Sequence, residues 1–430
     1  MMDAHLRAFL ADLFRTAVAA AHPSTCLPPL LPPPPAGRLI VLAAGKAAGS
    51  MAEAAEGFYL NRLKLTADRL CGIAVARHGY GRPLRIVTMI EAGHPVPDGA
   101  GLQAAARAIE FADGADADDL VLVLMSGGAS ANWIAPAAGL TFADKQAVTR
   151  ALLRSGATIG EINSVRKHLS RIKGGRLART AFPAKLVTIA ISDVPGDDPS
   201  AIGSGPTVPD PTTLADARAI VAKYRLDLPA SVTAALADTN NESPKPGDPA
   251  FAGSQFTLAA RPADSLRAVE AAVRAAGYDC VSLGANVEGE AREVAAAHAK
   301  LARELRAQGK RAVILSGGEL TVTIRGQGRG GPNQEYALAL AMGLADMPAV
   351  AALAGDTDGT DGGIGDPSDP AGALLDGGTV ARAAALGLDP AAFLADNNST
   401  AFFAALGDLL MTGATYTNVN DLRAIVVDRV

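Results

Sequence analysis

Aromatic residues and cysteines are scarce in this chain of 430 residues. Phe, Trp and Tyr make up 4% of the sequence, and the three cysteines, Cys26, Cys71 and Cys280, contain no C-x-x-C pair. This number and spacing exclude a disulfide framework and argue against structural zinc. Unpaired cysteines suit a reducing compartment, so we expect a cytoplasmic protein.

Long apolar runs and a strong charge of one sign are also missing. No apolar run approaches the ~18 residues that a membrane helix needs, and the N-terminus lacks a signal-peptide pattern. The net charge is -5 and there is no basic tail, which makes nucleic acid an unexpected partner. We therefore expect no membrane and no nucleic-acid partner, and the sequence leaves a homodimer open.

Aliphatic residues, Ala and Gly dominate what remains, and 49% of the chain is hydrophobic. From Gly37 onward, strand-like and helix-like patterns alternate. The run Leu120–Met125 is apolar throughout, as in a parallel strand that is covered on both faces. The length suggests two or three domains, and the polar, Pro- and Gly-rich segment 237–254 is the best boundary. We predict two α/β domains, residues 1–236 and 255–430, joined by that linker.

Four stretches give firmer expectations for single elements. Residues 2–21 are amphipathic and predict a helix, and Glu161–Leu177 predicts another. Thr141 with Asp144 has the spacing of a capping box. The run Leu320–Ile324 alternates apolar and polar residues, which predicts a half-exposed strand.

Ser-Gly-Gly follows an apolar strand in each half of the chain, at Ser126–Gly128 and at Ser316–Gly318. Open α/β sheets bind ligands at the carboxyl ends of their strands. Either copy alone is equally well explained as a tight turn. Together they favour glycine loops that bind a ligand.

Gly326, Gly328 and Gly331 have the spacing G-x-G-x-x-G, which raises the question of a dinucleotide fingerprint. The preceding run is not a fully apolar strand, and Arg325 and Arg329 flank the glycines. Guanidinium groups suit a loop that holds a transferring phosphoryl group. We interpret the motif as an anion loop, with a surface hairpin as the alternative.

Acidic clusters follow two predicted strands. Asp356, Asp358 and Asp361 follow one. The other is followed by Asp193, Asp197 and Asp198, ahead of the loop Gly203–Thr207. Grouped carboxylates repel one another unless a positive group lies among them. Mg²⁺ is the natural candidate, since it takes one or two carboxylates together with phosphate oxygens. A solvated turn is the alternative.

Basic residues stand near these loops. Lys46 follows the first predicted strand, and Arg166, Ser170 and Lys173 form a stripe on the helix predicted from Glu161. Such a stripe is usually a solvated face, but beside an acidic cleft it could bind an anionic substrate. His94 lies between Gly and Pro, and we expect it to be structural.

Nine stretches, in order from Gly45 to Leu422, together resemble the class II glycerate 2-kinases, whose C-terminal part is the MOFRL domain. They are "AAGKAA", "EAGHPVPD", "LMSGGASA", "INSVRKHLSRIKGGRLA", "ISDVPGDDPSAIGSGPTVPD", "LSGGELTVTI", "RGGPNQEYALALA", "GDTDGTDG" and "TGATYTNVNDL". The resemblance covers nearly the whole chain and is far more specific than any single motif. Some members of this family carry the older label hydroxypyruvate reductase.

The resemblance implies a Rossmann-like N-terminal domain with a mostly parallel sheet, a MOFRL domain with a mixed sheet, and an active site in the cleft between them. It implies ATP, a divalent metal such as Mg²⁺, and phosphoryl transfer to the C2 hydroxyl of D-glycerate. Lys46 and Arg325 match the catalytic lysine and arginine of the family.

We assign the remaining roles on this basis. Asp193 is the expected base or metal ligand, and Asp356 and Asp358 are competing metal ligands. The residues assigned to substrate or phosphate are Ser126, Gly127, Gly128, Ser130, Arg166, Gly203, Ser204, Gly205 and Thr207. Two rivals are an NAD(P)H-dependent hydroxypyruvate reductase and a non-catalytic sugar-acid binding protein.

Overall fold

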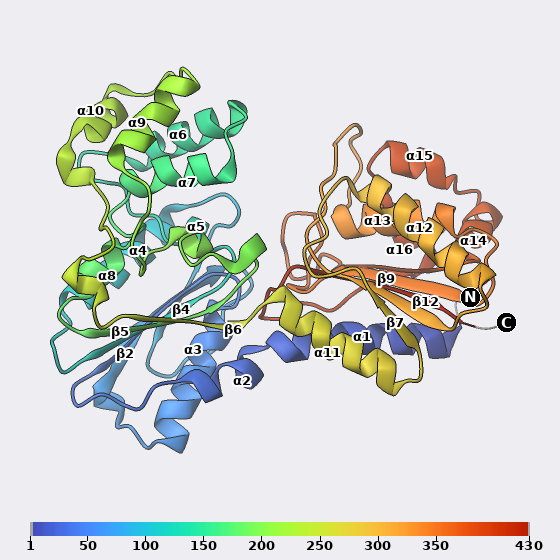
Figure 1. Cartoon of the computed structure of the whole chain (residues 1–430), viewed down its shortest axis with the longest axis horizontal. Helices are drawn as coiled ribbons and strands as arrows, with labels where there is room; N and C mark the ends of the chain where they lie inside the picture. Colours follow the sequence, from blue (N-terminus) through green and yellow to red (C-terminus); the bar gives the residue numbers. More distant parts are fainter. Residues whose placement is uncertain (1–2, 429–430) are drawn as a thin grey trace. The chain divides into compact units, whose positions relative to one another are not determined.

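The structure is a computed structural model that describes residues 3–428. Its chain forms two compact units. The central unit is Leu27–Ala259, and the terminal unit combines the residues up to Cys26 with those from Ala260 onward. Each unit has a six-stranded sheet with helices packed against it (Figure 1). The predicted fold class, two α/β units, is confirmed.

The sheet of the central unit has the strand order β3-β2-β1-β4-β5-β6. Its strands are β1 (Leu39–Ala44), β2 (Leu70–Arg77), β3 (Thr88–Ala92), β4 (Leu120–Met125), β5 (Lys185–Ile191) and β6 (Gln255–Ala260). The four pairings from β3 to β5 are parallel. Every residue of β1 and β4 is buried, because both faces of the sheet are covered. The carboxyl ends of β1 and β4 therefore lie side by side.

Helices cover both faces of this sheet, with α4 and α8 on one face and α3 on the other (Figure 1). Four more helices, α6, α7, α9 and α10, form a group with its own apolar core. The helices of the unit are α3 (Ala48–Glu56), α4 (Gly99–Asp113), α5 (Ala129–Asn132), α6 (Phe142–Arg154), α7 (Ile159–His168), α8 (Arg176–Ala181), α9 (Leu214–Lys223) and α10 (Ala230–Ala237).

The sheet of the terminal unit is mixed, in the order β11-β10-β9-β12-β8-β7. Only its β7–β8 pair is parallel among the pairings of the described residues. The strands are β7 (Asp279–Ser282), β8 (Ala312–Ser316), β9 (Val350–Asp356), β10 (Gly372–Asp376), β11 (Leu409–Leu410) and β12 (Asp421–Val427). The predicted mixed sheet of the C-terminal half is thereby confirmed.

Two apolar cores lie on the two faces of this mixed sheet. Helices α1 and α11 cover one face, and α12 and α13 cover the other (Figure 1). The helices are α1 (Ala4–Ala21), α2 (Pro23–Cys26), α11 (Pro262–Ala275), α12 (Ala291–Ala307), α13 (Pro332–Gly343), α14 (Thr379–Ala385), α15 (Pro390–Ala395) and α16 (Ser399–Leu406). No helix within residues 3–428 has the length and apolar character needed to cross a membrane.

The units group the residues differently from the predicted domain division. Helix α1 buries Leu10, Leu13 and Phe14 in a core shared with α11 and the mixed sheet, so it belongs to the terminal unit. Strand β6, predicted for the second domain, joins the sheet of the central unit beside β5. The predicted linker, 237–254, also lies in the central unit.

Two predicted elements were wrong, and two local predictions were right. The helix expected over residues 2–21 is present as α1, and residue 2 lies outside the described residues. The helix expected over Glu161–Leu177 ends at His168, and the chain then turns through Gly174 and Gly175, whose φ angles of 60° and 79° are left-handed. The strand expected over Leu320–Ile324 contains only a single bridge, at Thr321. The capping box at the start of α6 is present as predicted.

Candidate functional site

Lys46 and the first Ser-Gly-Gly loop are tied together where β1 and β4 end. The Lys46 N–H donates to the Gly127 carbonyl oxygen at 2.8 Å. The Ser126 hydroxyl oxygen accepts a 2.9 Å hydrogen bond from the Ala47 N–H. Ser126 is buried and Lys46 is half-buried. The parallel pairing of β1 with β4 thus holds this lysine at the carboxyl edge of the sheet, beside a glycine loop.

Gly128 has to be glycine for two reasons. Its φ of 86° is left-handed. A Cβ atom at this position would also lie 2.9 Å from the His94 ring and 3.4 Å from Cγ of Lys46. The half-buried His94 ring therefore packs directly on the loop, in the neighbourhood of Lys46.

The loop at Ser130 meets the second predicted phosphate loop. The Ser130 and Ser204 hydroxyl oxygens lie 2.7 Å apart. Gly203, Ser204 and Gly205 have consecutive φ angles of 57°, 65° and 58°, a tight left-handed turn. A Cβ on Gly203 would come within 2.2 Å of the Met125 side chain at the end of β4. Two segments separated by more than 70 residues thus meet through their serine hydroxyls, with Ser130 half-buried and Ser204 buried.

Asp193 lies just after the end of β5, and Thr207 lies just beyond the glycine turn at 203–205. Thr207 is buried, and its hydroxyl accepts a 2.8 Å hydrogen bond from the Thr188 hydroxyl of β5. That contact fixes the loop to the sheet. Asp193 is half-buried and follows Ile191, the last residue of β5, by two positions.

Two cations donate to the backbone carbonyl of Ser130, and a third lies beside them. Lys173 Nζ donates to the Ser130 carbonyl oxygen at 2.9 Å, and Arg166 Nη2 reaches the same oxygen at 3.5 Å. Lys145 Nζ donates to the Arg166 carbonyl oxygen at 3.2 Å. Arg166 and Lys173 are therefore neighbours, although the predicted helix that was to join them ends between them. We call Lys145, Arg166 and Lys173 the cation cluster.

Burial dominates the electrostatics of the cation cluster. It lowers the pKa of Lys145 to about 7, and the charge of Arg166 adds to that shift. Burial also holds the pKa of Lys173 well below its ordinary value, again helped by the neighbouring positive charges. Lys145 is not among the site residues predicted from the sequence. The helical spacing could have identified it, because Lys145 lies on the buried side of α6 together with Val148 and Leu152.

In the terminal unit, the segment around Arg325 is held by residues 396–398. The backbone N–H groups of Arg325 and Gly326 donate to Asn397 Oδ1 at 2.7 and 2.9 Å. The Gln327 N–H donates to Asp396 Oδ1 at 3.0 Å. The side chain of Arg325 is exposed. Asn397 was missed in the sequence, where "DNNS" offers only a turn-like composition.

The G-x-G-x-x-G spacing is explained by close packing. A Cβ on Gly326 would lie 2.3 Å from the Asp396 carbonyl oxygen, and one on Gly328 would lie 2.3 Å from Cβ of Asn398. A Cβ on Gly331 would lie 2.4 Å from the backbone of Asp361. Each glycine therefore lets this segment approach another part of the chain closely. This close packing explains the glycine spacing without a bound pyrophosphate.

The acids after β9 differ in their surroundings. Asp358 is 1% exposed, and its N–H donates to Asp356 Oδ1 at 2.9 Å. Asp361 accepts hydrogen bonds from the backbone and side-chain amides of Asn333 and Gln334 at the start of α13. Burial raises the pKa of Asp361 to about 7. Asp361 thus anchors α13, while Asp356 and Asp358 share one turn.

The candidate metal ligands belong to both units, Asp193 to the central one and Asp356 and Asp358 to the terminal one. Within residues 3–428, no three potential ligands are grouped as a ready metal site. Two carboxylates on one turn still match the donor set of Mg²⁺, which takes few protein ligands and completes its shell with water and phosphate oxygens.

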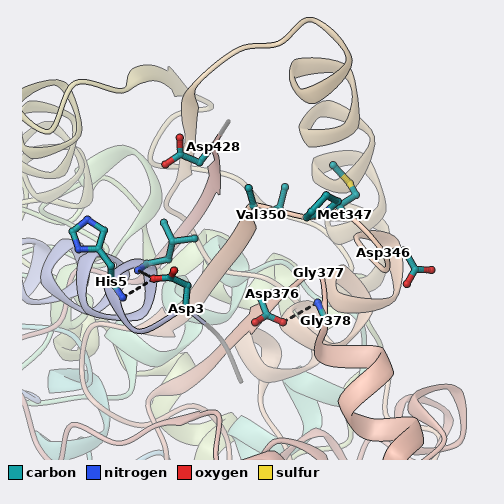
Figure 2. A pocket seen from close by; sticks show the side chains of 12 residues that line it. Asp3, His5, Asp346, Met347, Val350, Asp376, Gly377, Gly378 and Asp428 are labelled. Atoms are coloured by element: carbon teal, nitrogen blue, oxygen red, sulfur yellow. Dashed lines mark hydrogen bonds between the residues drawn. The ribbon is translucent and has the colours of Figure 1, made fainter. Parts of the chain in front are cut away.

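A cavity of about 810 Å³ in the terminal unit contains none of these candidates (Figure 2). It is lined by Asp3, His5, Leu6, Asp346, Met347, Pro348, Ala349, Val350, Asp376, Gly377, Gly378 and Asp428. Its rim includes the first and last described residues, Asp3 and Asp428. Its acids would repel phosphate, so we do not assign the reaction to it.

Comparisons with known proteins agree with this fold. Residues 9–237 match the family described as "Domain of unknown function (DUF4147)", and residues 312–421 match the "MOFRL family". D-glycerate 2-kinase of Thermotoga maritima is 35% identical, over 97% of each chain. An Agrobacterium vitis protein with the provisional name hydroxypyruvate reductase is 47% identical, over 99% of this chain and 95% of its own. The crystal structure of Thermotoga maritima glycerate kinase has a TM-score of 0.87 and 34% identity, covering 99% of this chain and 100% of that one.

These likenesses extend over both α/β units and define the class as phosphotransferases that act on an alcohol group. The chain belongs to the glycerate kinase family whose members combine a DUF4147 region with a MOFRL region. The resemblance predicted from the nine sequence stretches is thereby confirmed.

Proposed function

We propose that this protein is an ATP-dependent glycerate 2-kinase, which transfers the γ-phosphoryl group of ATP to the C2 hydroxyl of D-glycerate and gives 2-phosphoglycerate. The observation that carries the proposal is the tie between Lys46 and the Ser126–Gly128 loop at the carboxyl edge of β1 and β4. A lysine beside a glycine loop at such an edge is suited to bind and neutralise phosphate.

In the proposed reaction, the C2 oxygen of glycerate forms a bond to the γ-phosphorus, and the bond from that phosphorus to the bridging oxygen of ADP breaks. Such transfer depends on positioning and charge neutralisation more than on covalent chemistry. Lys46 and Arg325 neutralise charge on the transferring group. Asp193 takes the hydroxyl proton in this scheme.

The remaining candidate residues bind the two substrates. The Ser126–Gly128 loop holds phosphate through its amides, and the surface around Ser130 and Ser204 holds phosphate or glycerate through hydroxyls and amides. Arg166 binds the glycerate carboxylate, because its guanidinium can donate two parallel hydrogen bonds to a planar anion. Thr207 supports the turn from its contact with β5.

Magnesium fits the proposed reaction as a charge-neutralising ion for the phosphates of ATP. Asp193 would hold it, or Asp356 and Asp358 as competing ligands. The N–H of Asp358 keeps its neighbouring carboxylate, Asp356, in the same turn.

The rival function, an NAD(P)H-dependent hydroxypyruvate reductase, draws support from the name of the Agrobacterium vitis relative. Its sequence support was the G-x-G-x-x-G motif. Close packing against Asp396 and Asn398 accounts for Gly326 and Gly328, and the residues directly before the motif, 322–325, form no strand. The kinase is therefore the better-supported function.

Product analysis tests the proposal. The purified protein is incubated with D-glycerate and Mg-ATP, and ion chromatography or ³¹P NMR separates 2-phosphoglycerate from 3-phosphoglycerate. We expect 2-phosphoglycerate and one ADP for each product molecule, with loss of turnover after EDTA treatment. The 3-phospho isomer or no product would refute the proposal, and full activity after EDTA would refute its magnesium part.

A further inference from the structure

The cation cluster has no acidic partner among the described residues. Lys145 and Lys173 are 6% and 2% exposed, and each donates to one backbone carbonyl. The adjacent lysine of α7 is different, because Lys167 forms an ion pair with the buried Asp210 at 3.2 Å. The fold therefore supplies a counterion for one buried lysine and leaves the cation cluster without one.

A bound anion would supply the negative charge that the cation cluster lacks. An ammonium group has three N–H donors, and one carbonyl satisfies only one of them. Burying a charge without a partner is costly, and the positive charges in the cation cluster also repel one another. A negatively charged ligand bound among these side chains would offset that repulsion and accept from their remaining N–H donors. Since Arg166 and Ser130 are half-buried, the cluster is not sealed from solvent.

The position of the cluster favours a small anion. Arg166 and Lys173 donate to the backbone carbonyl of Ser130, whose hydroxyl lies against Ser204 of the second loop. The planar guanidinium of Arg166 matches a carboxylate, and flanking ammonium groups can bind its remaining lone pairs. Nucleotide phosphates have their own candidate site at Lys46 and Gly127.

From this geometry we propose that Lys145 and Lys173 complete, with Arg166, a buried binding site for the carboxylate of the acceptor. The site would select 2-hydroxy acids and reject neutral polyols such as glycerol. This inference rests on the proposed function, which supplies the hydroxy-acid acceptor. It adds two binding residues and a basis for acceptor specificity.

Binding measurements without catalysis test the inference. Isothermal titration calorimetry measures the affinities of D-glycerate, hydroxypyruvate, glycerol and ATP, each alone, for wild type, Lys145→Met and Lys173→Met. Methionine keeps a long, flexible chain and removes the charge, so the fold should survive, which thermal unfolding checks. Arg150→Met is the matched control, because Arg150 is an exposed cation on α6 outside the cluster.

We expect both lysine variants to bind D-glycerate and hydroxypyruvate roughly tenfold or more weakly, the effect of losing one charged hydrogen bond. Their ATP affinity should stay within about twofold, and Arg150→Met should match wild type. Wild type should bind glycerol far more weakly than D-glycerate. A selective loss of ATP affinity would make the cluster a nucleotide-phosphate site, and unchanged affinities, or no carboxylate binding by wild type, would also overturn the inference.

Failure of the proposed function would look different. Wild type would then bind carboxylates through the cluster but form no phosphoglycerate from D-glycerate and Mg-ATP. Hydroxypyruvate makes this separation possible, because it has the carboxylate but lacks the C2 hydroxyl that accepts a phosphoryl group.

Discussion

The backbone N–H of Arg325 donates a 2.7 Å hydrogen bond to Oδ1 of Asn397, 72 residues further along the chain. The Asn397 amide nitrogen in turn donates to Glu335 Oε2 of α13 at 2.8 Å. Glu335 accepts from Arg292 Nε of α12 at 2.6 Å. The exposed Arg325 side chain is thus carried by a backbone that is fixed to two packed helices.

Asn397→Ala should reduce catalysis by freeing this backbone. We expect kcat to fall by roughly tenfold or more, because small misplacements of a catalytic group are costly, while KM for ATP changes less. Asn397 acts through Arg325 in this account. The double variant with Arg325→Ala should therefore be no slower than Arg325→Ala alone. If the double variant loses kcat by the product of the two single losses, Asn397 has a role separate from Arg325.

Gly328→Ala should destabilise the fold. The new Cβ would lie 2.3 Å from Cβ and 2.6 Å from Cα of Asn398, so the backbone has to shift. Overpacking of this kind costs about 1–3 kcal/mol, measured by urea unfolding. Gly253→Ala is the control, since nothing lies within 4 Å of its Cβ position. Unchanged stability with weaker NADH binding would instead support the dinucleotide interpretation.

Lys46→Ala should lower kcat with little effect on folding. The backbone N–H of Lys46, which makes the bond to Gly127, is retained in this variant. A charge that acts in the transition state is worth roughly a hundredfold in rate. Steady-state kinetics with ATP and D-glycerate give the measurement. A normal kcat with a raised KM would make Lys46 a ground-state binding residue.

Lys145 should make stability depend on pH. Its pKa falls from 10.5 to about 7 on folding, because burial and the nearby Arg166 disfavour the charged form. Between these values the unfolded chain holds one more proton, so the free energy of unfolding rises with pH from about 7 to 10, by up to about 1.4 kcal/mol per pH unit.

Lys145→Met should remove this contribution. Urea unfolding measures the free energy of unfolding of wild type and variant between pH 7 and 10, in the absence of carboxylate ligands. The difference between the two curves is the contribution of Lys145. Parallel profiles from pH 7 to 10 would show that Lys145 keeps an ordinary pKa in the folded protein.

Much of the fold was predictable where burial leaves a clear mark in the sequence. Leu120–Met125 is apolar at every position because the sheet is covered on both faces, and β4 has the predicted bounds. Leu320–Ile324 failed for the opposite reason. Leu320 and Val322 pack on the core while Ile324 is 80% exposed, so alternating burial arose there without a strand.

The site was less predictable, because its contacts join distant segments. Ser-Gly-Gly at residues 126–128 marked a ligand loop, but nothing local places Ser130 against Ser204. Arg166 and Lys173 were predicted to lie on one basic stripe of a single helix, but that helix ends between them, at His168. Their actual meeting depends on the irregular chain between His168 and Lys173, where Ser170 pairs with Pro136, and on the Ser130 carbonyl that both side chains reach.

The most direct test of the central claim, that Arg325 and its glycine segment serve phosphoryl transfer, is a paired assay. It measures phosphate transfer from ATP to D-glycerate, and NADH or NADPH oxidation with hydroxypyruvate, in wild type, Arg325→Ala and Arg325→Lys. We predict kinase turnover in wild type, its loss in Arg325→Ala, and only partial rescue by lysine, which lacks the planar fork of arginine. No variant should oxidise NADH or NADPH. Robust reductase turnover by wild type without ATP consumption would contradict the account.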